Sequence, residues 1–232
     1  MKWEKPLTEA TLLKRYKRFL ADIRLENETL TIHVPNTGSM TSCWEPNWKC
    51  AISKSENPNR KMPYTLEFTH NGETWIGVNT GNANKIVKNW LNLKLIPELD
   101  GYTKIETEKK TGSSRIDFFL EGHSHFSPCY VEVKSVTVKL DGKAQFPDAV
   151  SERGQKHLRE LMDLKKKGFR AVMLYVVQRE DVSQMRPAKE IDSKYAELLA
   201  EAQAVGVEIL VYQCKMDLDE IGFGRSLPFD LE

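Results

Sequence analysis

The stretch of residues 115–136 contains two apolar, strand-like segments on either side of a short polar break. The first reads R-I-D-F-F-L and the second Y-V-E-V-K-S-V. Strand alternation puts Asp117 on one face of the first segment, and Glu132 and Lys134 together on one face of the second. Because large apolar residues flank these charges, we expect them to meet in a polar pocket within a core rather than on a solvated surface.

Two carboxylates and an ammonium group held together favour hydrolysis of a phosphodiester. Asp117 and Glu132 can bind Mg²⁺ or Mn²⁺, with the main-chain carbonyl of Val133 as a further ligand and water in the remaining positions. Lys134 can then contact the phosphate or help to activate the attacking water. The spacing D-x14-E-x-K resembles the core of PD-(D/E)XK nucleases. Ordinary amphipathic strands also carry E-x-K pairs, so the motif alone leaves a structural interpretation open.

Length, charge and apolar runs narrow the class of protein. The 232 residues, 40% of them hydrophobic, can bury a core as one large domain or two small ones. The formal charge of +1 excludes a globally basic chain, so any nucleic-acid-binding surface must be local. No apolar signal segment opens the chain, and the most apolar run, 171–177, is too short to span a bilayer. We therefore expect a cytoplasmic protein with no membrane partner and with reduced cysteines.

The first part of the chain is rich in strand signals separated by clusters of Pro, Gly and Asn. Five short strands within about 80 residues predict a small barrel of the OB type, a fold that binds nucleic acids and oligosaccharides. We expect this OB-like domain over residues 1–81. The five candidate segments are residues 13–25, 29–34, 48–54, 64–69 and 74–78.

A basic segment, K-R-Y-K-R-F at 14–19, lies within the first of these candidates. A continuous strand would place Lys14, Tyr16 and Arg18 on one face and the other three residues on the opposite face. Basic residues interleaved with aromatic ones can contact phosphates and stack on bases. A basic edge strand that discourages aggregation has the same pattern. The candidate nucleic-acid contacts here are Lys14, Arg15, Tyr16, Lys17 and Arg18.

The pattern changes after residue 79, where helical and buried-strand segments alternate. Their order matches the αβββαβ core of PD-(D/E)XK nucleases, so we expect such a domain, with a mixed central sheet, over residues 82–232. Glu106 and Glu108 share a face of its first strand and are weaker candidates for the acidic site. Asp148 or Ser151 can cap the second helix. The predicted elements are a helix at 83–93, a strand at 102–109, the two central strands, a helix ending near 167, a strand at 169–177, a helix at 192–204 and a last buried strand.

The second of these helices begins S-E-R-G-Q-K-H-L-R and directly follows the predicted site. Arg153 and Gln155 on it could contact phosphates. A solvated helix face is the alternative, and it suits Lys156 and Arg159 better than Gln155. The Q-x3-Y signature common among these nucleases is absent, because Arg159 stands where the tyrosine would be.

Several long strings are spread along the whole chain, including R-Y-K-R-F-L-A-D, H-V-P-N-T-G-S-M, S-R-I-D-F-F-L, V-E-V-K-S-V and F-P-D-A-V-S-E-R-G-Q-K-H-L-R-E-L-M. Together they resemble one family, the sugar fermentation stimulation protein A (SfsA) family. This resemblance implies an OB-like N-terminal domain, a nuclease-like C-terminal domain and DNA binding in a bacterial cytoplasm. The family name records an effect on sugar use and no chemical step.

Two hypotheses follow. One is a Mg²⁺-dependent nuclease, and the other is a non-catalytic DNA-binding regulator of sugar metabolism genes that keeps the nuclease fold as a scaffold. Three buried charges favour the nuclease, because a pure scaffold has no evident reason to bear their desolvation cost. Strandedness, the choice between DNA and RNA, and the oligomeric state are left open at this point.

Overall fold

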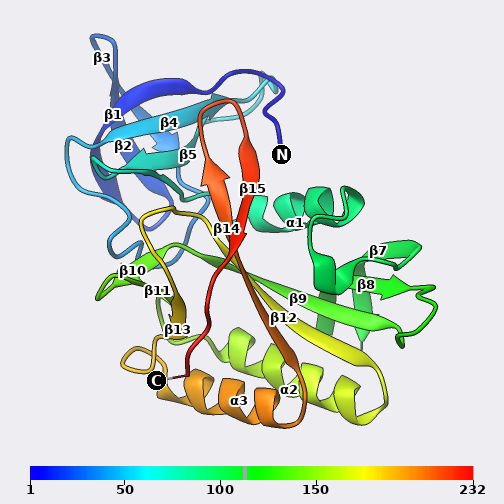
Figure 1. Cartoon of the computed structure of the whole chain (residues 1–232). Helices are drawn as coiled ribbons and strands as arrows, with labels where there is room; N and C mark the ends of the chain where they lie inside the picture. Colours follow the sequence, from blue (N-terminus) through cyan, green and yellow to red (C-terminus); the bar gives the residue numbers. More distant parts are fainter. Residues whose placement is uncertain (112–113, 232) are drawn as a thin grey trace.

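Turn-forming residues interrupt the first third of the chain, so its strands are short and pair mainly with their sequence neighbours (Figure 1). The computed structural model describes residues 1–111 and 114–231. The strands of this region are β1 (Thr8–Tyr16), β2 (Leu20–Leu25), β3 (Glu28–His33), β4 (Lys49–Lys54), β5 (Tyr64–His70) and β6 (Trp75–Gly77).

Strands β1 to β5 close into a barrel. They pair in the order β3-β2-β1-β4-β5, and a parallel contact between His33 and Thr65 joins β3 to β5. Alternate side chains point inward, and Leu12, Ile23 and Ile32 are fully buried there. The predicted OB-like barrel is confirmed. The candidate at 74–78 does not close the ring, because β6 pairs only with the last residues of β5 within this sheet, and β3 makes the closing contact.

The predicted continuous strand at 13–25 is wrong, since the chain turns at residues 17–19. Lys17 and Arg18 have left-handed backbones, with φ of 48° and 62°, and Tyr16 pairs directly with Leu20. The amide of Phe19 donates to the carbonyl of Lys17 (2.8 Å) and closes the turn. The sequence has no Gly or Asn at this turn, and these are the residues that typically indicate a tight hairpin. Lys17, Arg18 and Phe19 therefore lie at a hairpin tip rather than on strand faces.

The second part of the chain has the predicted order of elements, and the αβββαβ core with its mixed sheet is confirmed. Its strands pair in the order β15-β14-β12-β9-β8-β7, with β9, β12 and β14 parallel and the others antiparallel. Helices α2 and α3 lie side by side on one face of the sheet (Figure 1). The elements are α1 (Asn82–Asn92), β7 (Lys104–Thr111), β8 (Ser114–Glu121), β9 (Cys129–Val136), α2 (Glu152–Lys166), β12 (Arg170–Val177), α3 (Ser193–Ala204) and β14 (Glu208–Met216).

Short elements that the sequence patterns did not predict complete this unit. A small sheet pairs β10 (Val138–Leu140), β11 (Lys143–Phe146) and β13 (Met185–Pro187), and β15 (Ile221–Ser226) extends the main sheet beyond β14. A 3₁₀ turn, η1 (Pro97–Leu99), follows α1. The four cysteines are buried and form no disulfide. No helix in the described residues is long and apolar enough to cross a membrane.

Buried contacts fix the barrel against the α/β unit. Phe68 of β5 belongs to the same apolar cluster as α1 and the inner face of the main sheet. The guanidinium of Arg179, which is 1% exposed, donates to the carbonyls of Ser42 (3.2 Å) and Thr137 (2.8 Å) and pairs with Asp181. Because these contacts come from both units, the barrel loops stand in a defined position beside the sheet.

Arg15 organises the barrel loop that faces the sheet. Its guanidinium donates to the main-chain carbonyls of Arg18 (2.7 Å), Asn36 (3.0 Å) and Gly38 (2.8 Å). A Cβ added at Gly38 would overlap the carboxylate of Asp148, so this loop and the α/β unit are in close contact. Arg15 thus holds the hairpin tip at 17–19 and the loop at 36–39 together.

Arg15→Met should lower the free energy of unfolding by about 1–3 kcal/mol, because it keeps the apolar stem and leaves the loop carbonyls without their donor. Urea denaturation of the full chain measures this change. Arg18→Met is the matched control, because the Arg18 side chain is exposed, and its effect should stay within about 0.5 kcal/mol. Equal effects of the two substitutions would contradict a structural role for Arg15.

Candidate active site

Strands β8 and β9 separate where the acidic residues begin. Their ladder ends at the pair Phe118 and Val131, and Asp117 and Glu132 are the next residues along the two strands. The amide of Val133 donates to the Asp117 carboxylate (Oδ2, 2.8 Å), so a side chain takes the place of a main-chain acceptor there. The other oxygen, Oδ1, accepts from the Asn84 amide of α1 (2.7 Å). The end of the ladder therefore opens a polar gap in the sheet.

Glu132 is 2% exposed and has two different oxygens. Oε1 accepts from the Lys134 ammonium (2.7 Å) and contacts Nδ1 of His157, which lies on α2. Since a carboxylate only accepts, the second contact is favourable with the imidazole proton on Nδ1. Oε2 is buried and has no hydrogen-bond partner in the described part of the chain. One side of this carboxylate is thus held in place while the other is available to a ligand.

The environment shifts the pKa values of the two acids in opposite directions. Burial and the neighbouring charge of Glu132 raise the pKa of Asp117, although hydrogen bonds from Val133 and Asn84 oppose the shift. Burial would also raise the pKa of Glu132, but the hydrogen bond from His157 and the charge of Lys134 outweigh it and lower that pKa. Two carboxylates that repel each other in this way favour a bound cation between them.

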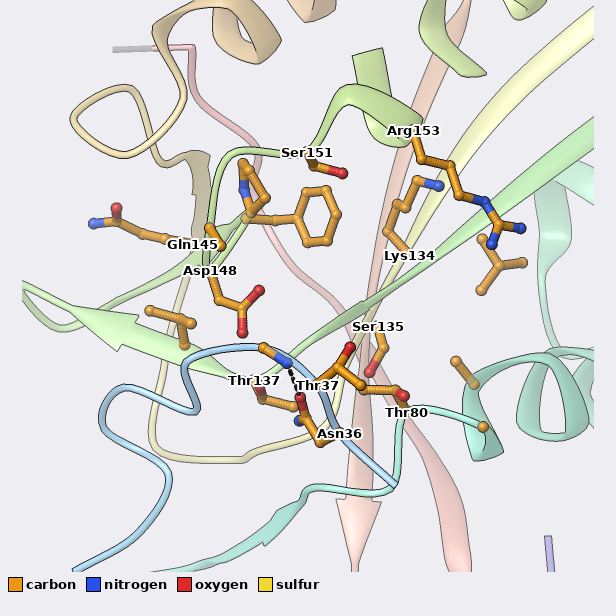
Figure 2. A pocket seen from close by; sticks show the side chains of 18 of the residues that line it. Asn36, Thr37, Thr80, Lys134, Ser135, Thr137, Gln145, Asp148, Ser151 and Arg153 are labelled. Atoms are coloured by element: carbon orange, nitrogen blue, oxygen red, sulfur yellow. Dashed lines mark hydrogen bonds between the residues drawn. The ribbon is translucent and has the colours of Figure 1, made fainter. Parts of the chain in front are cut away.

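The acidic pair lines a cavity of about 520 Å³. Barrel residues 36–38 form one wall, Thr80 and Gly81 before α1 continue it, and residues 145–151 with Arg153 form another. Figure 2 shows Lys134 and Arg153 on one side of the pocket, and Asn36 and Thr37 of the barrel loop on another. Both parts of the chain therefore contribute to a single site.

The donor set fits Mg²⁺ or Mn²⁺ better than a metal held wholly by side chains. The described residues contain no cluster of three or more His, Cys, Asp or Glu side chains suited to a metal. Asp117 and the unpartnered Oε2 of Glu132 offer two carboxylates, and Val133 lines the same cavity. Mg²⁺ is commonly bound through one or two carboxylates and keeps several waters. The predicted ligands Asp117, Glu132 and Val133 are brought together by the fold.

The structure adds two residues that the sequence analysis did not select. His157 lies on the buried face of α2 with Leu158 and Leu161 and contacts both Glu132 and Lys134 (Lys134 Nζ, 3.1 Å). Its signal was a titratable residue among the apolar positions of an amphipathic helix. Asn84 lies in the first turn of α1, and nothing in the sequence pattern linked it to Asp117.

Two predicted phosphate contacts on α2 have different environments. Arg153 is exposed and lines the cavity. Gln155 instead donates its amide to the carboxylate of Asp192 (3.0 and 3.2 Å), which also caps α3 through the amide of Tyr195 (2.9 Å). Gln155 therefore connects α2 to α3 and does not line the cavity.

The residues of the predicted basic segment of the barrel also have different environments. Arg15 is committed to the loop carbonyls, as described above, and Tyr16 donates to Asp22 (2.9 Å) while Lys14 lies over its ring. Lys17 and Arg18 project from the exposed hairpin tip. Of these five predicted contacts, Lys17 and Arg18 are the two at the hairpin tip beside the cavity wall.

The weaker candidates Glu106 and Glu108 do not join the acidic pair. Hydrogen bonds from Lys104 (2.8 Å) and Lys109 (2.7 Å) lower the pKa of Glu106 to about 2. Glu108 has a left-handed backbone (φ 55°), which breaks the strand alternation that placed it on the same face as Glu106. It lines a separate hollow beside α2.

An OB barrel followed by an αβββαβ domain with a buried acidic pair defines a nuclease-like fold. Two family models match the chain, the "SfsA N-terminal OB domain" over residues 13–78 and the "Sugar fermentation stimulation protein RE domain" over residues 81–220. The chain belongs to the sugar fermentation stimulation protein (SfsA) family, which confirms the resemblance found in its sequence.

Similar proteins cover the whole chain. A "Sugar fermentation stimulation protein homolog" from Shewanella sp. (strain MR-4) is 48% identical over 233 residues, 98% of this chain and 99% of the relative. One from Geotalea daltonii is 47% identical over 225 residues, 96% of each chain. The solved structure of Pyrococcus furiosus SfsA, described as a complex with Ca²⁺, is 29% identical and superposes with a TM-score of 0.89 over 99% of this chain and 98% of that one.

The pairing of Glu132 with His157 can be tested by a double-mutant cycle. His157→Leu should lower the free energy of unfolding by about 1–3 kcal/mol, because the buried carboxylate loses a partner. In a Glu132→Gln background the same change should cost less, with a coupling of about 0.5–3 kcal/mol in urea denaturation. His125→Leu, in an exposed loop, is the control and should be nearly neutral. Strictly additive effects would show that the two residues do not interact.

Proposed function

We propose that the protein is a nuclease that hydrolyses phosphodiester bonds of DNA with Mg²⁺ or Mn²⁺. The observation that carries this proposal is the buried Oε2 of Glu132, which has no partner among the described residues and belongs to the same site as Asp117. Burial and, after it, the charge of Glu132 raise the pKa of Asp117, and a cation would offset both effects. An acid pair in a cleft, with pKa values shifted in opposite directions, is typical of active sites. The nuclease-like fold and the OB barrel support nucleic acid as the substrate. The Ca²⁺ complex of the Pyrococcus relative supports divalent-cation binding.

Each residue of the site has a distinct part in this chemistry. Mg²⁺ bound at Asp117, Glu132 and the Val133 carbonyl would polarise a phosphoryl oxygen and lower the pKa of a bound water. Asn84 and the Val133 amide orient Asp117, and His157 orients Glu132. The Lys134 ammonium stabilises the charge that develops on the phosphate. Arg153, at the cavity rim, contacts the phosphate backbone.

Mg²⁺ should stabilise the protein through the acidic pair. At a concentration about 100-fold above its dissociation constant, Mg²⁺ should add about 2.7 kcal/mol to the free energy of unfolding, because it binds only the folded acids. Thermal unfolding with and without Mg²⁺ measures the effect. Asp117→Asn and Glu132→Gln should abolish it, whereas Glu106→Gln, which alters a surface ion pair, should not. Undiminished stabilisation of the two site variants would place the metal elsewhere.

Loss of Lys134 should separate catalysis from binding. Lys134→Met keeps most of the apolar stem and removes the ammonium, so cleavage of labelled DNA should slow by about 10²-fold or more while DNA binding stays close to that of the parent. Lys167→Met, just past the far end of α2, is the matched control and should leave cleavage unchanged.

Two results would contradict this mechanism. Equal cleavage by the Lys134→Met variant and the parent would remove Lys134 from the reaction. Binding by the parent without cleavage, across single- and double-stranded DNA and RNA with Mg²⁺ or Mn²⁺, would favour the alternative function. In that case the protein would be a non-catalytic DNA-binding regulator of sugar metabolism genes.

A further inference from the structure

We propose that the substrate is a single strand, which runs from the barrel hairpin tip at 17–19 across the acidic pair and leaves between α2 and the β7–β8 hairpin. This inference rests on the proposed nuclease function and adds the strandedness and the path of the substrate. Three features of the molecule support it: a second hollow beside the cavity, a cavity wall that hydrogen bonds hold in place, and an exposed aromatic residue among cations at the hairpin tip.

A second hollow, of about 990 Å³, lies beside α2 and adjoins the cavity at Arg153, which lines both spaces. The acidic pair lines the first cavity, and His157, which contacts Glu132, lines the second hollow together with Glu108 and Glu152. Lys110 and Arg115 come from the two strands of the β7–β8 hairpin and face the same hollow as Arg153. These three cations have no ion-pair partner among the residues that the structure describes. They suit the phosphates of a strand leaving the site.

The barrel side of the cavity has cations and an exposed ring. Lys17 and Arg18 are exposed and unpaired within the described residues, and the side chain of Phe19 is 48% exposed. The same guanidinium of Arg15 binds the carbonyls of Arg18 in this tip and of Gly38 in the cavity wall, so the two are adjacent. Cations beside an aromatic ring are the combination with which proteins bind single strands, by phosphate contacts and base stacking.

The cavity wall between the tip and the acids is tied down from both units. Ser39 donates to the carbonyl of Asp148 (3.0 Å), the Asn36 side chain to the carbonyl of Val78 (3.1 Å), and Thr80 to the carbonyl of Pro35 (3.0 Å). Within the loop, the amide of Gly38 donates to the Asn36 side chain (2.9 Å), drawn as a dashed line in Figure 2. The wall cannot move outward without breaking these bonds.

This fixed wall limits which form of nucleic acid can reach the proposed metal ligands. A cavity of about 520 Å³ lies within the range of about 300–1,000 Å³ that holds a drug-sized ligand, which a nucleotide resembles in size. A duplex would bring a second backbone against the loop at 36–39. A single strand brings one backbone and leaves its bases free to stack on Phe19. The geometry therefore favours a single strand.

Binding measured in EDTA tests the strandedness without cleavage. A labelled 20-nucleotide single strand should bind the full chain at least ten-fold more tightly than the duplex of the same sequence, by fluorescence anisotropy. Phe19→Ala should weaken single-strand binding about ten-fold or more, as expected for a lost stacking contact. Phe126→Ala is the matched control. Phe126 is 56% exposed, but it lies in the loop after β8, away from the end of that strand where Arg115 lines the second hollow.

The salt dependence tests the cations of the tip. Replacing Lys17 and Arg18 together with glutamine should reduce the slope of log affinity against log salt by about 1.4, which is about 0.7 for each lost phosphate contact with a single strand. The same change at Lys166 and Lys167, at the far end of α2, removes equal charge and should leave the slope unaltered.

The outcomes distinguish this inference from the proposed function. Duplex binding as tight as single-strand binding, or no binding of either, overturns the inference. An unchanged affinity of the Phe19→Ala variant overturns the path. Efficient cleavage of duplex with weak binding of single strands would leave the nuclease standing and refute the single-strand substrate. Tight single-strand binding without cleavage under any metal would support the path and refute the nuclease.

Discussion

The buried carboxylate of Glu132 sets the demands that the rest of the site meets. Burying a charge is costly unless partners offset the desolvation, and one oxygen of this carboxylate has no partner in the part of the chain that the structure describes. His157 must therefore reach it from α2, and Lys134 from two residues along the same strand. Asp117, a second carboxylate, lies beside it with a raised pKa. Such an arrangement is costly for the free protein, and the proposed cation would offset that cost, as is typical of a site maintained for a ligand.

The central part of this arrangement is predictable because it is local. Alternation along β8 and β9 places Asp117, Glu132 and Lys134 on defined faces, and the spacing of apolar residues distinguishes helices from buried strands through the rest of the unit. Ser151 caps α2 and Asp192 caps α3, as polar residues at helix starts commonly do. The αβββαβ order follows from patterns that each span about ten residues.

The features that the sequence did not predict depend on partners that lie far apart in the chain. Arg15 looks like a free cation until the fold supplies the carbonyls of Asn36 and Gly38, and Gln155 looks like a phosphate contact until Asp192 accepts its amide. The turn at 17–19 uses left-handed backbones at Lys17 and Arg18, which local propensity does not favour. The pair of His157 and Glu132 is likewise separated by a loop, a small sheet and the start of α2.

A nearly neutral chain can still carry the proposed nucleic-acid path, because total charge says little about the local surface. Arg15 is used within the barrel, and Arg179 is used between the barrel and the α/β unit. Around the cavity the balance differs, because Arg153, Lys110 and Arg115 have no ion-pair partners in the described chain. The barrel thus contributes in two ways. Its half-buried Arg15 positions the wall of the site, and that position brings the exposed hairpin tip, with its own cations and aromatic ring, next to the wall of the cavity that holds the acids.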